Sequence, residues 1–186
     1  MAAAQQQPQM GLTFEDVWAA LMETREHINK LTEEVDRVTK NVGGLNRSMG
    51  ELIETLIAAR LWEKFDDYSY NFTRAYRRVE LFDETNRKLT DIDILLTNGE
   101  SVMAVEVKRE LDSKEDVDHH LKRMELILQY TPDQCKGKKL LGAISGGTVD
   151  PDVCAYAQSV GFFVLELTGE SVHLVKPPVG FVPREW

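Results

Sequence analysis

The sequence predicts an α/β domain preceded by a long coiled-coil helix. A heptad repeat of apolar residues runs through residues 17–56, and strand-like runs alternate with helix-like stretches after Phe65. The turn signal Asn98-Gly99 separates two runs with a period of two, a pattern typical of a β-hairpin. We therefore expect a disordered tail over residues 1–13, a coiled-coil helix over residues 14–48 and one globular domain over residues 49–186.

Composition limits the location and the partners. The first dozen residues are mostly Ala and Gln, with one Pro and no periodicity, and they lack the basic and apolar segments of a signal peptide. No stretch approaches the roughly 20 apolar residues of a membrane span, so we expect a cytoplasmic protein with no membrane partner. The net charge of -9 argues against a general basic coat for nucleic acid, yet it allows a local basic patch.

The heptad repeat predicts a parallel homodimer, because β-branched residues at a positions with Leu at d positions favour two strands. The a positions are Leu21, Ile28, Val35, Val42, Met49 and Leu56, and the d positions are Val17, Thr24, Leu31, Val38, Leu45 and Leu52. Gly43, Gly44 and Gly50 each disfavour helix by about 1 kcal/mol. Since the heptad phase continues across them, we expect one continuous helix; a helical hairpin and an amphipathic helix packed on its own domain are the alternatives.

Short periodic runs predict the elements of the domain in order. We expect a strand or strand pair over residues 68–82, the hairpin over residues 89–108 and a helix over residues 113–130. A short buried strand over residues 139–144 then leads, through the turn Ser145-Gly146-Gly147, to a helix over residues 151–160. A last hairpin pairs residues 162–167 with residues 172–175.

Acidic residues gather on one face of the predicted hairpin. Alternation puts Asp91, Asp93, Glu106 and Lys108 on this face, and it also carries the apolar residues Leu95, Val102 and Ala104. The opposite face carries Ile92, Ile94, Leu96, Met103, Val105 and Val107. The acidic face is therefore partly apolar ground on which several carboxylates converge.

Converging carboxylates repel one another unless a cation joins them, and oxygen ligands of this kind suit Mg²⁺, with Mn²⁺ as an alternative. Magnesium held by one or two carboxylates commonly serves phosphate chemistry. Lys108 would stand beside the metal, where an amino group can orient or deprotonate an attacking water or stabilise developing negative charge.

Asp93, followed thirteen positions later by Glu106-Val107-Lys108, resembles the D…ExK signature of the PD-(D/E)XK nuclease superfamily. The stretches MGELIETLIAARLWEKF, EVKRELDSKEDVDHHLKRM and FVPREW resemble, more narrowly, an uncharacterised bacterial and archaeal group in which a coiled coil precedes such a domain. The resemblance implies a restriction-endonuclease-like mixed sheet flanked by helices, with the core order helix, three-stranded meander, helix and strand. It also implies Mg²⁺-dependent hydrolysis of DNA phosphodiesters.

The same resemblance assigns the metal ligands. Asp93 and Glu106 would bind the ion together with an acid of the first helix, for which Glu54 is the first choice and Glu51, one turn earlier, the weaker one. No proline precedes the motif acid, and two aspartates compete for its position. A two-residue loop would set Asp91 opposite Glu106, whereas a four-residue loop would set Asp93 there. The resemblance favours Asp93 and keeps Asp91 as a further metal candidate.

Basic residues supply candidates for nucleic-acid contacts. Arg74, Arg77 and Arg78 alternate with aromatic residues, a pattern that can follow a phosphate backbone. Lys122 and Arg123 lie on the helix after the hairpin and could touch a phosphate. His119 and His120, on the same helix, cannot both face one ion, because adjacent helical residues point about 100° apart.

These features predict a coiled-coil dimer that carries a Mg²⁺-dependent endonuclease domain, with Glu54, Asp93, Glu106 and Lys108 at the catalytic site. The alternative is a non-catalytic scaffold or DNA-binding module that keeps a nuclease-like fold. The acidic net charge favours the alternative, and the complete D…ExK set favours the enzyme.

Overall fold

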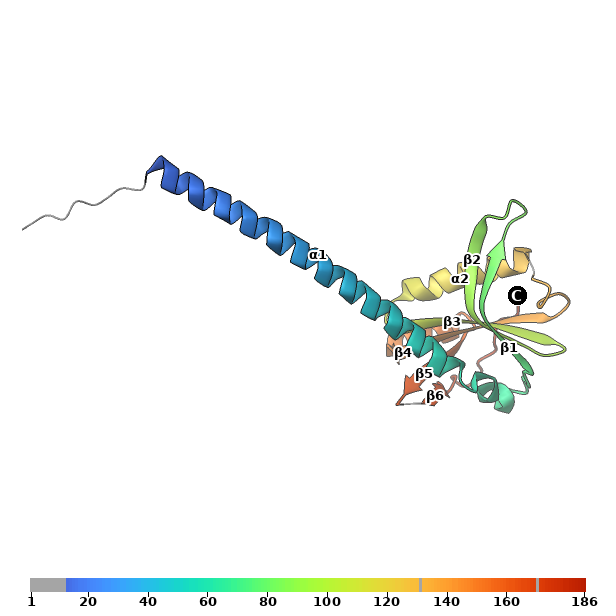
Figure 1. The fold of residues 1–186 in the computed structure, drawn as a ribbon. Helices are drawn as coiled ribbons and strands as arrows, with labels where there is room; N and C mark the ends of the chain where they lie inside the picture. Colours follow the sequence, from blue (N-terminus) through green and yellow to red (C-terminus); the bar gives the residue numbers. More distant parts are fainter. Residues whose placement is uncertain (1–12, 131, 170) are drawn as a thin grey trace, which may run out of the picture. The chain divides into compact units, whose positions relative to one another are not determined.

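The computed structural model describes residues 13–130, 132–169 and 171–186. The predicted tail therefore lies outside the described residues except for Thr13. The elements follow in the order α1 (Phe14–Ala58), the 3-10 helix η1 (Leu61–Tyr68), β1 (Arg74–Phe82), β2 (Lys88–Thr97), β3 (Ser101–Leu111), α2 (Lys114–Tyr130), β4 (Lys139–Val149), α3 (Pro151–Ser159), β5 (Phe163–Thr168) and β6 (Ser171–Leu174) (Figure 1). The chain divides into two compact units between Arg47 and Ser48.

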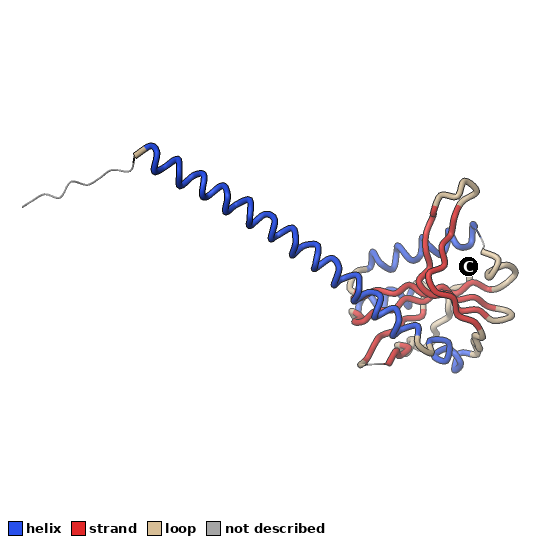
Figure 2. Tube along the Cα trace, viewed as in Figure 1, coloured by secondary structure: helices blue, strands red, loops and turns tan. Residues whose placement is uncertain are grey.

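Helix α1 is continuous across Gly43 and Gly44, as the unbroken heptad predicts, and Figure 2 shows it as one blue helix. Thr13 and Asp16 cap its start reciprocally, since the Asp16 carboxylate accepts the Thr13 amide and the Thr13 hydroxyl accepts the Asp16 amide. The apolar heptad side chains are exposed; Leu31 and Leu45, for example, are 60% and 70% exposed. Within the described ranges, no helix has the length and apolar character needed to cross a membrane.

The second unit contains a mixed sheet with strand order β1-β2-β3-β4-β5-β6, as expected for an α/β fold. Strands β1, β2 and β3 form an antiparallel meander, β3, β4 and β5 are parallel neighbours, and β6 is antiparallel to β5. Parallel neighbours need crossover connections, and helices α2 and α3 provide them (Figure 1).

Each face of the sheet is covered by different helices. On one face, α2 and α3 contribute Val117, Met124 and Ala157 to a core that includes Leu95 and Ile144. On the other face, the end of α1 and η1 contribute Ile57 and Phe65, among others, to a second core. Burial of these apolar side chains at about 25 cal/mol per Å² holds the last turns of α1 to the sheet.

Three local predictions were wrong. Residues 68–82 do not begin as a strand, because Tyr68 still belongs to η1, Ser69 ends that helix with a left-handed φ of 64°, and the strand starts only at Arg74. Strand β4 runs through Gly146 and Gly147 to Val149, so these glycines are not a turn. A Cβ at Gly147 would lie 2.6 Å from the Arg109 carbonyl oxygen, and glycine therefore lets β4 continue close beside β3.

The third error concerns Ile92, which the strict alternation put on the face opposite Asp93. Ile92 packs instead in the same core cluster as Leu95, whereas Ile94 and Leu96 belong to the other cluster. Strand β2 thus changes its facing around Asp93, which is also where its pairing with both neighbours is interrupted.

Candidate active site

Asp93 lies at a gap in the hydrogen-bonded ladders on both sides of β2. On one side, Arg77 pairs with Ile94 and Val79 with Ile92, so Arg78 and Asp93 are opposite each other without pairing. On the other side, the ladder with β3 ends at the pair Ile94 and Val105. The carboxylate of Asp93 is half-buried there, and its Oδ2 accepts a hydrogen bond of 2.8 Å from the Val107 amide.

The register of the hairpin distinguishes the two candidate aspartates. Thr97 pairs with Val102, which leaves four residues in the loop between them. Continuing this register by one position beyond Ile94 and Val105 sets Asp93 opposite Glu106. Asp91 lies away from Glu106 and forms an exposed ion pair of 3.2 Å with Lys88.

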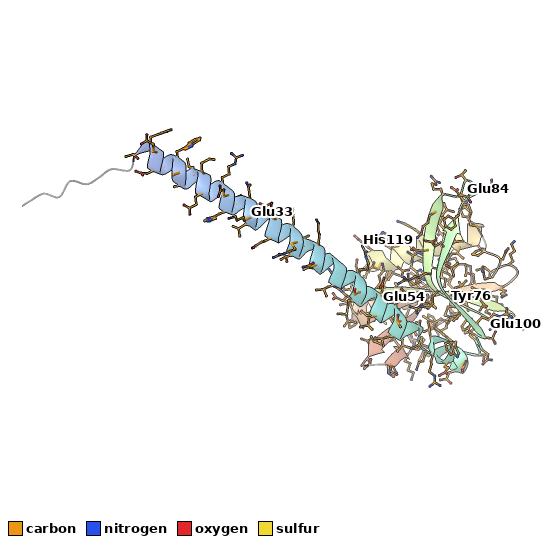
Figure 3. The ribbon with its side chains drawn as sticks, in the orientation of Figure 1. Glu33, Glu54, Tyr76, Glu84, Glu100 and His119 are labelled. Carbon is orange, nitrogen blue, oxygen red and sulfur yellow. The ribbon has the colours of Figure 1, made fainter. Side chains whose placement is uncertain are left out.

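Glu54 comes to the sheet on the last turns of α1, between the buried residues Ile53 and Ile57 (Figure 3). The helical spacing of these apolar neighbours turns Glu54 toward β1, and the residue is only 8% exposed. Its Oε1 accepts a hydrogen bond of 3.1 Å from Arg77 Nη2. Its Oε2 accepts bonds of 3.3 Å and 3.2 Å from Nε and Nη2 of Arg78.

Glu106 on β3 is also buried and paired. Lys108 Nζ lies 3.2 Å from Glu106 Oε1, and Arg123 of α2 forms an ion pair with Oε2. Lys108 is held in place by a second contact of 3.0 Å with Asp116, in the first turn of α2. Arg123 also donates a hydrogen bond of 3.0 Å to the Thr90 hydroxyl. Helix α2 therefore orients both basic groups that face Glu106.

Burial is the main reason that the pKa of the Asp93 carboxyl is raised above its ordinary value. The Val107 amide and the positive charge of Arg123 oppose this rise, while the negative charges of Glu54 and Asp91 add to it. Asp93 is thus a half-buried acid close to other negative charges. Such a place favours an added cation.

Carboxylate oxygens from α1, β2 and β3 are ligands that suit Mg²⁺ or Mn²⁺ in their chemistry. Their present partners are basic side chains and one amide. Across residues 13–130, 132–169 and 171–186, no three His, Cys, Asp or Glu side chains are grouped closely enough to hold a metal ion. The carboxylates therefore fit a divalent cation in their chemistry and in the elements that carry them. To bind such a cation, Glu54 and Glu106 would have to leave their basic partners.

Other predicted residues lie outside this cluster. Glu51 is exposed and reaches Arg78 only at 3.7 Å. Arg74 is exposed and lines a pocket of about 230 Å³ with Trp62 and Phe72, near the start of β1. Lys122 is exposed on α2, whereas its neighbour Arg123 points to Glu106 rather than to solvent.

The two histidines separate as the helical geometry predicts. His119 is exposed, and His120 is buried at 1% exposure against Phe162. Both ring nitrogens of His120 lack a hydrogen-bond partner. Burial lowers the pKa of His120 to about 4, although the nearby backbone of Ala104 and Ala143 opposes this effect.

Sequence reasoning missed Asp116 and Thr90, which hold Lys108 and Arg123. Acidic residues in the first turn of a helix are common for reasons of helix electrostatics, so Asp116 carried no signal of its own. In comparisons with known proteins, no protein-family model and no curated protein matches this chain.

Proposed function

We propose that this protein is a metal-dependent nuclease of the PD-(D/E)XK type that hydrolyses DNA phosphodiesters. The observation that carries the proposal is the position of Asp93. Its half-buried carboxylate lies in β2, where the ladders with β1 and β3 are interrupted, and the hairpin register sets it opposite buried Glu106, which pairs with Lys108. Together with buried Glu54 of α1, whose negative charge acts on Asp93, these acids from three elements are more than a solvated strand edge requires.

The order of elements supports the same proposal. The end of α1, the meander β1 to β3, helix α2 and strand β4 follow in the order that the resemblance implies for a restriction-endonuclease-like core. Strand β4 is parallel to β3, so α2 crosses one face of the sheet and brings Asp116 to Lys108 and Arg123 to Glu106.

In this proposal, Asp93, Glu106 and Glu54 hold a divalent cation, Mg²⁺ or Mn²⁺. When bound, such a cation polarises a phosphoryl oxygen and makes a bound water more acidic. The amino group of Lys108, fixed between Glu106 and Asp116, orients the attacking water and stabilises negative charge that develops on the phosphate. Arg123 stands on the α2 side, where its guanidinium can neutralise a phosphate oxygen.

The deciding experiment is a cleavage assay on single-stranded, duplex and branched DNA and on RNA, with Mg²⁺ or Mn²⁺ against EDTA. We expect DNA cleavage that requires the cation and disappears in Glu106→Gln. Glu100→Gln, an exposed position in the hairpin loop, is the matched control and should cleave like the parent. Cation-dependent cleavage that survives in Glu106→Gln would contradict the proposal.

We propose further that α1 pairs with a second copy of itself in a parallel coiled coil. The exposed heptad side chains support this, because a long uncovered apolar stripe is typical of an association surface. Sedimentation equilibrium should give a dimer for the parent and a monomer for Leu31→Lys, at a d position. Glu33→Lys, at an outward f position and labelled in Figure 3, should remain dimeric. A monomeric parent at micromolar concentration would contradict this proposal.

A non-catalytic scaffold or DNA-binding module is the second candidate. The ion pairs of Glu54 and Glu106 with the chain's own basic residues favour it, since a purely structural cluster would look the same. The same cleavage assay separates the candidates. Binding of DNA without cleavage under every cation would support the second one.

A further inference from the structure

Two successive residues of β1 bind the same carboxylate. Side chains of neighbouring residues in a regular strand point to opposite faces, so Arg77 and Arg78 would not normally reach one partner. Here Arg78 has a φ of 51°, in the left-handed region that residues with a Cβ seldom adopt. This local turn of the backbone, opposite Asp93, brings both guanidinium groups to Glu54.

The two arginines are exposed although their partner is not. Their side chains are 43% and 58% exposed, while the Glu54 side chain is only 11% exposed. A guanidinium group presents the same fork of N–H donors to a carboxylate and to a phosphate. Arg77 and Arg78 can therefore turn to an external phosphate without any unfolding of the sheet, whereas Glu54 has to stay where it is.

The arginines should leave Glu54 only when another positive charge takes their place. In the free protein, Glu54 pairs with Arg77 and Arg78, and Glu106 pairs with Lys108 and Arg123. If Glu54 gives its oxygens to a divalent cation, the two arginines of β1 lose their buried carboxylate partner and the cluster gains positive charge. Arg77 then keeps only the Thr55 hydroxyl at 3.1 Å, and Arg78 only the exposed Glu51 at 3.7 Å, so both guanidinium groups can bind a phosphodiester beside the cation.

We propose that Arg77 and Arg78 form a phosphate-binding pair that Glu54 occupies in the free protein. A divalent cation at Glu54 releases the pair, and nucleic acid bound to the pair releases Glu54. The cation and the nucleic acid therefore bind cooperatively. This inference rests on the proposed function of the site, and it adds that the free protein is held in a state with low affinity for both ligands.

The experiment measures binding rather than turnover. Isothermal titration gives the Kd of Ca²⁺, which suits oxygen ligands, with and without a short DNA duplex. It also gives the Kd of the duplex with and without Ca²⁺, and a gel of the titrated sample checks that the duplex is intact. For the parent we expect each ligand to tighten the other by the same factor, roughly 5- to 100-fold. A factor of one would overturn the proposal.

Glu54→Gln tests the release directly. The amide keeps the shape of the side chain but loses the charge that holds the arginines, so the duplex should bind at least about fivefold more tightly without cation, and the coupling should disappear. Glu84→Gln, in the exposed turn between β1 and β2, removes one negative charge as Glu54→Gln does, and it should keep the coupling (Figure 3). Equal duplex affinities in the two variants would overturn the proposal.

The double variant Arg77→Met with Arg78→Gly tests the exchange by removing both arginines. Glycine is chosen at position 78 because it suits the left-handed backbone there. Without the arginines that compete for Glu54, Ca²⁺ alone should bind several-fold more tightly than to the parent, and duplex should no longer tighten it. Arg74→Met removes one positive charge from the same strand and should leave the Ca²⁺ affinity unchanged. Unchanged Ca²⁺ affinity in a folded double variant would count against the exchange.

The two proposals fail differently. Coupled binding without cleavage in Mg²⁺ would overturn the nuclease and leave the exchange intact. Cleavage in Mg²⁺ without coupling in Ca²⁺ would overturn the exchange and leave the nuclease intact.

Discussion

Glu54 and Asp93 are at least partly buried, whereas an acidic residue close to each of them in the sequence is exposed to solvent. Glu54 is buried and held by two arginines, while Glu51, one turn earlier on α1, is exposed. Asp93 is half-buried and accepts a backbone amide, while Asp91 is exposed and pairs with Lys88. The difference shows that the spacing of acidic residues in the sequence does not by itself predict which of them belong to a candidate site. A buried carboxylate needs specific hydrogen-bond or ion-pair partners, whereas an exposed one is solvated by water.

The largest effect is expected where the proposed metal ligand Glu106 and the proposed water-orienting group Lys108 are compared directly. In Lys108→Met the carboxylates remain, so cation binding should survive, while turnover should fall roughly 10²–10⁴-fold. In Glu106→Gln the charge proposed to hold the cation is lost, and both cation binding and cleavage should disappear. Titration with Mn²⁺ beside plasmid cleavage measures both. Full activity in Lys108→Met would break the assignment of the site.

The next prediction sets the two aspartates against each other. Asp93→Asn should lower the rate of cleavage by roughly 10²-fold or more, because it removes a proposed cation ligand. Asp91→Asn should change it by less than about twofold, because an exposed pair in water contributes little. Initial rates of plasmid cleavage at saturating Mg²⁺ give the ratio. The reverse ranking would show that the two-residue loop, and not the observed register, forms in solution.

His120 extends the comparison to a buried group without partners. Its pKa is about 4 in the folded protein and about 6.5 in an unfolded chain, so the unfolded state binds more protons between these values. The free energy of unfolding should therefore keep its full value above pH 6.5 and fall by about 3 kcal/mol as the pH falls to 4. Urea unfolding across this range should show a weaker decline in His120→Leu. Identical slopes for parent and variant would exclude His120 as the cause.

The smallest effect separates the two glutamates of α1 through stability. Glu54→Gln should lower the free energy of unfolding by about 1–2 kcal/mol, because charge-assisted hydrogen bonds from two arginines are weakened. Glu51→Gln should stay within about 0.5 kcal/mol of the parent, as expected for an exposed side chain. Chemical denaturation of the two variants gives the difference. Equal losses would mean that Glu54 is not held by its arginines.

Local patterns were enough to predict several parts of the fold. The heptad predicted a continuous helix through Gly43 and Gly44, and period-two alternation around Asn98-Gly99 predicted the hairpin of β2 and β3. The reason is that side-chain direction repeats every 3.6 residues in a helix and every two in a strand. The same periodicity failed at Ile92, where the pairing of β2 is interrupted and the repeat no longer applies.

By itself the sequence determined which charged residues were available. It supplied two pairs of acidic candidates for a metal site, at positions 51 and 54 and at positions 91 and 93. It also supplied a lysine two residues after Glu106 and arginines on what became β1 and α2. Only the tertiary structure decided among them, through the four-residue loop, the left-handed Arg78 and the packing of α2. Glu54 lies 24 residues from Arg78, and Thr90 lies 33 residues from Arg123. Contacts at such separations depend on how whole elements pack, because burial and charge pairing act through space and leave no periodic trace in the chain.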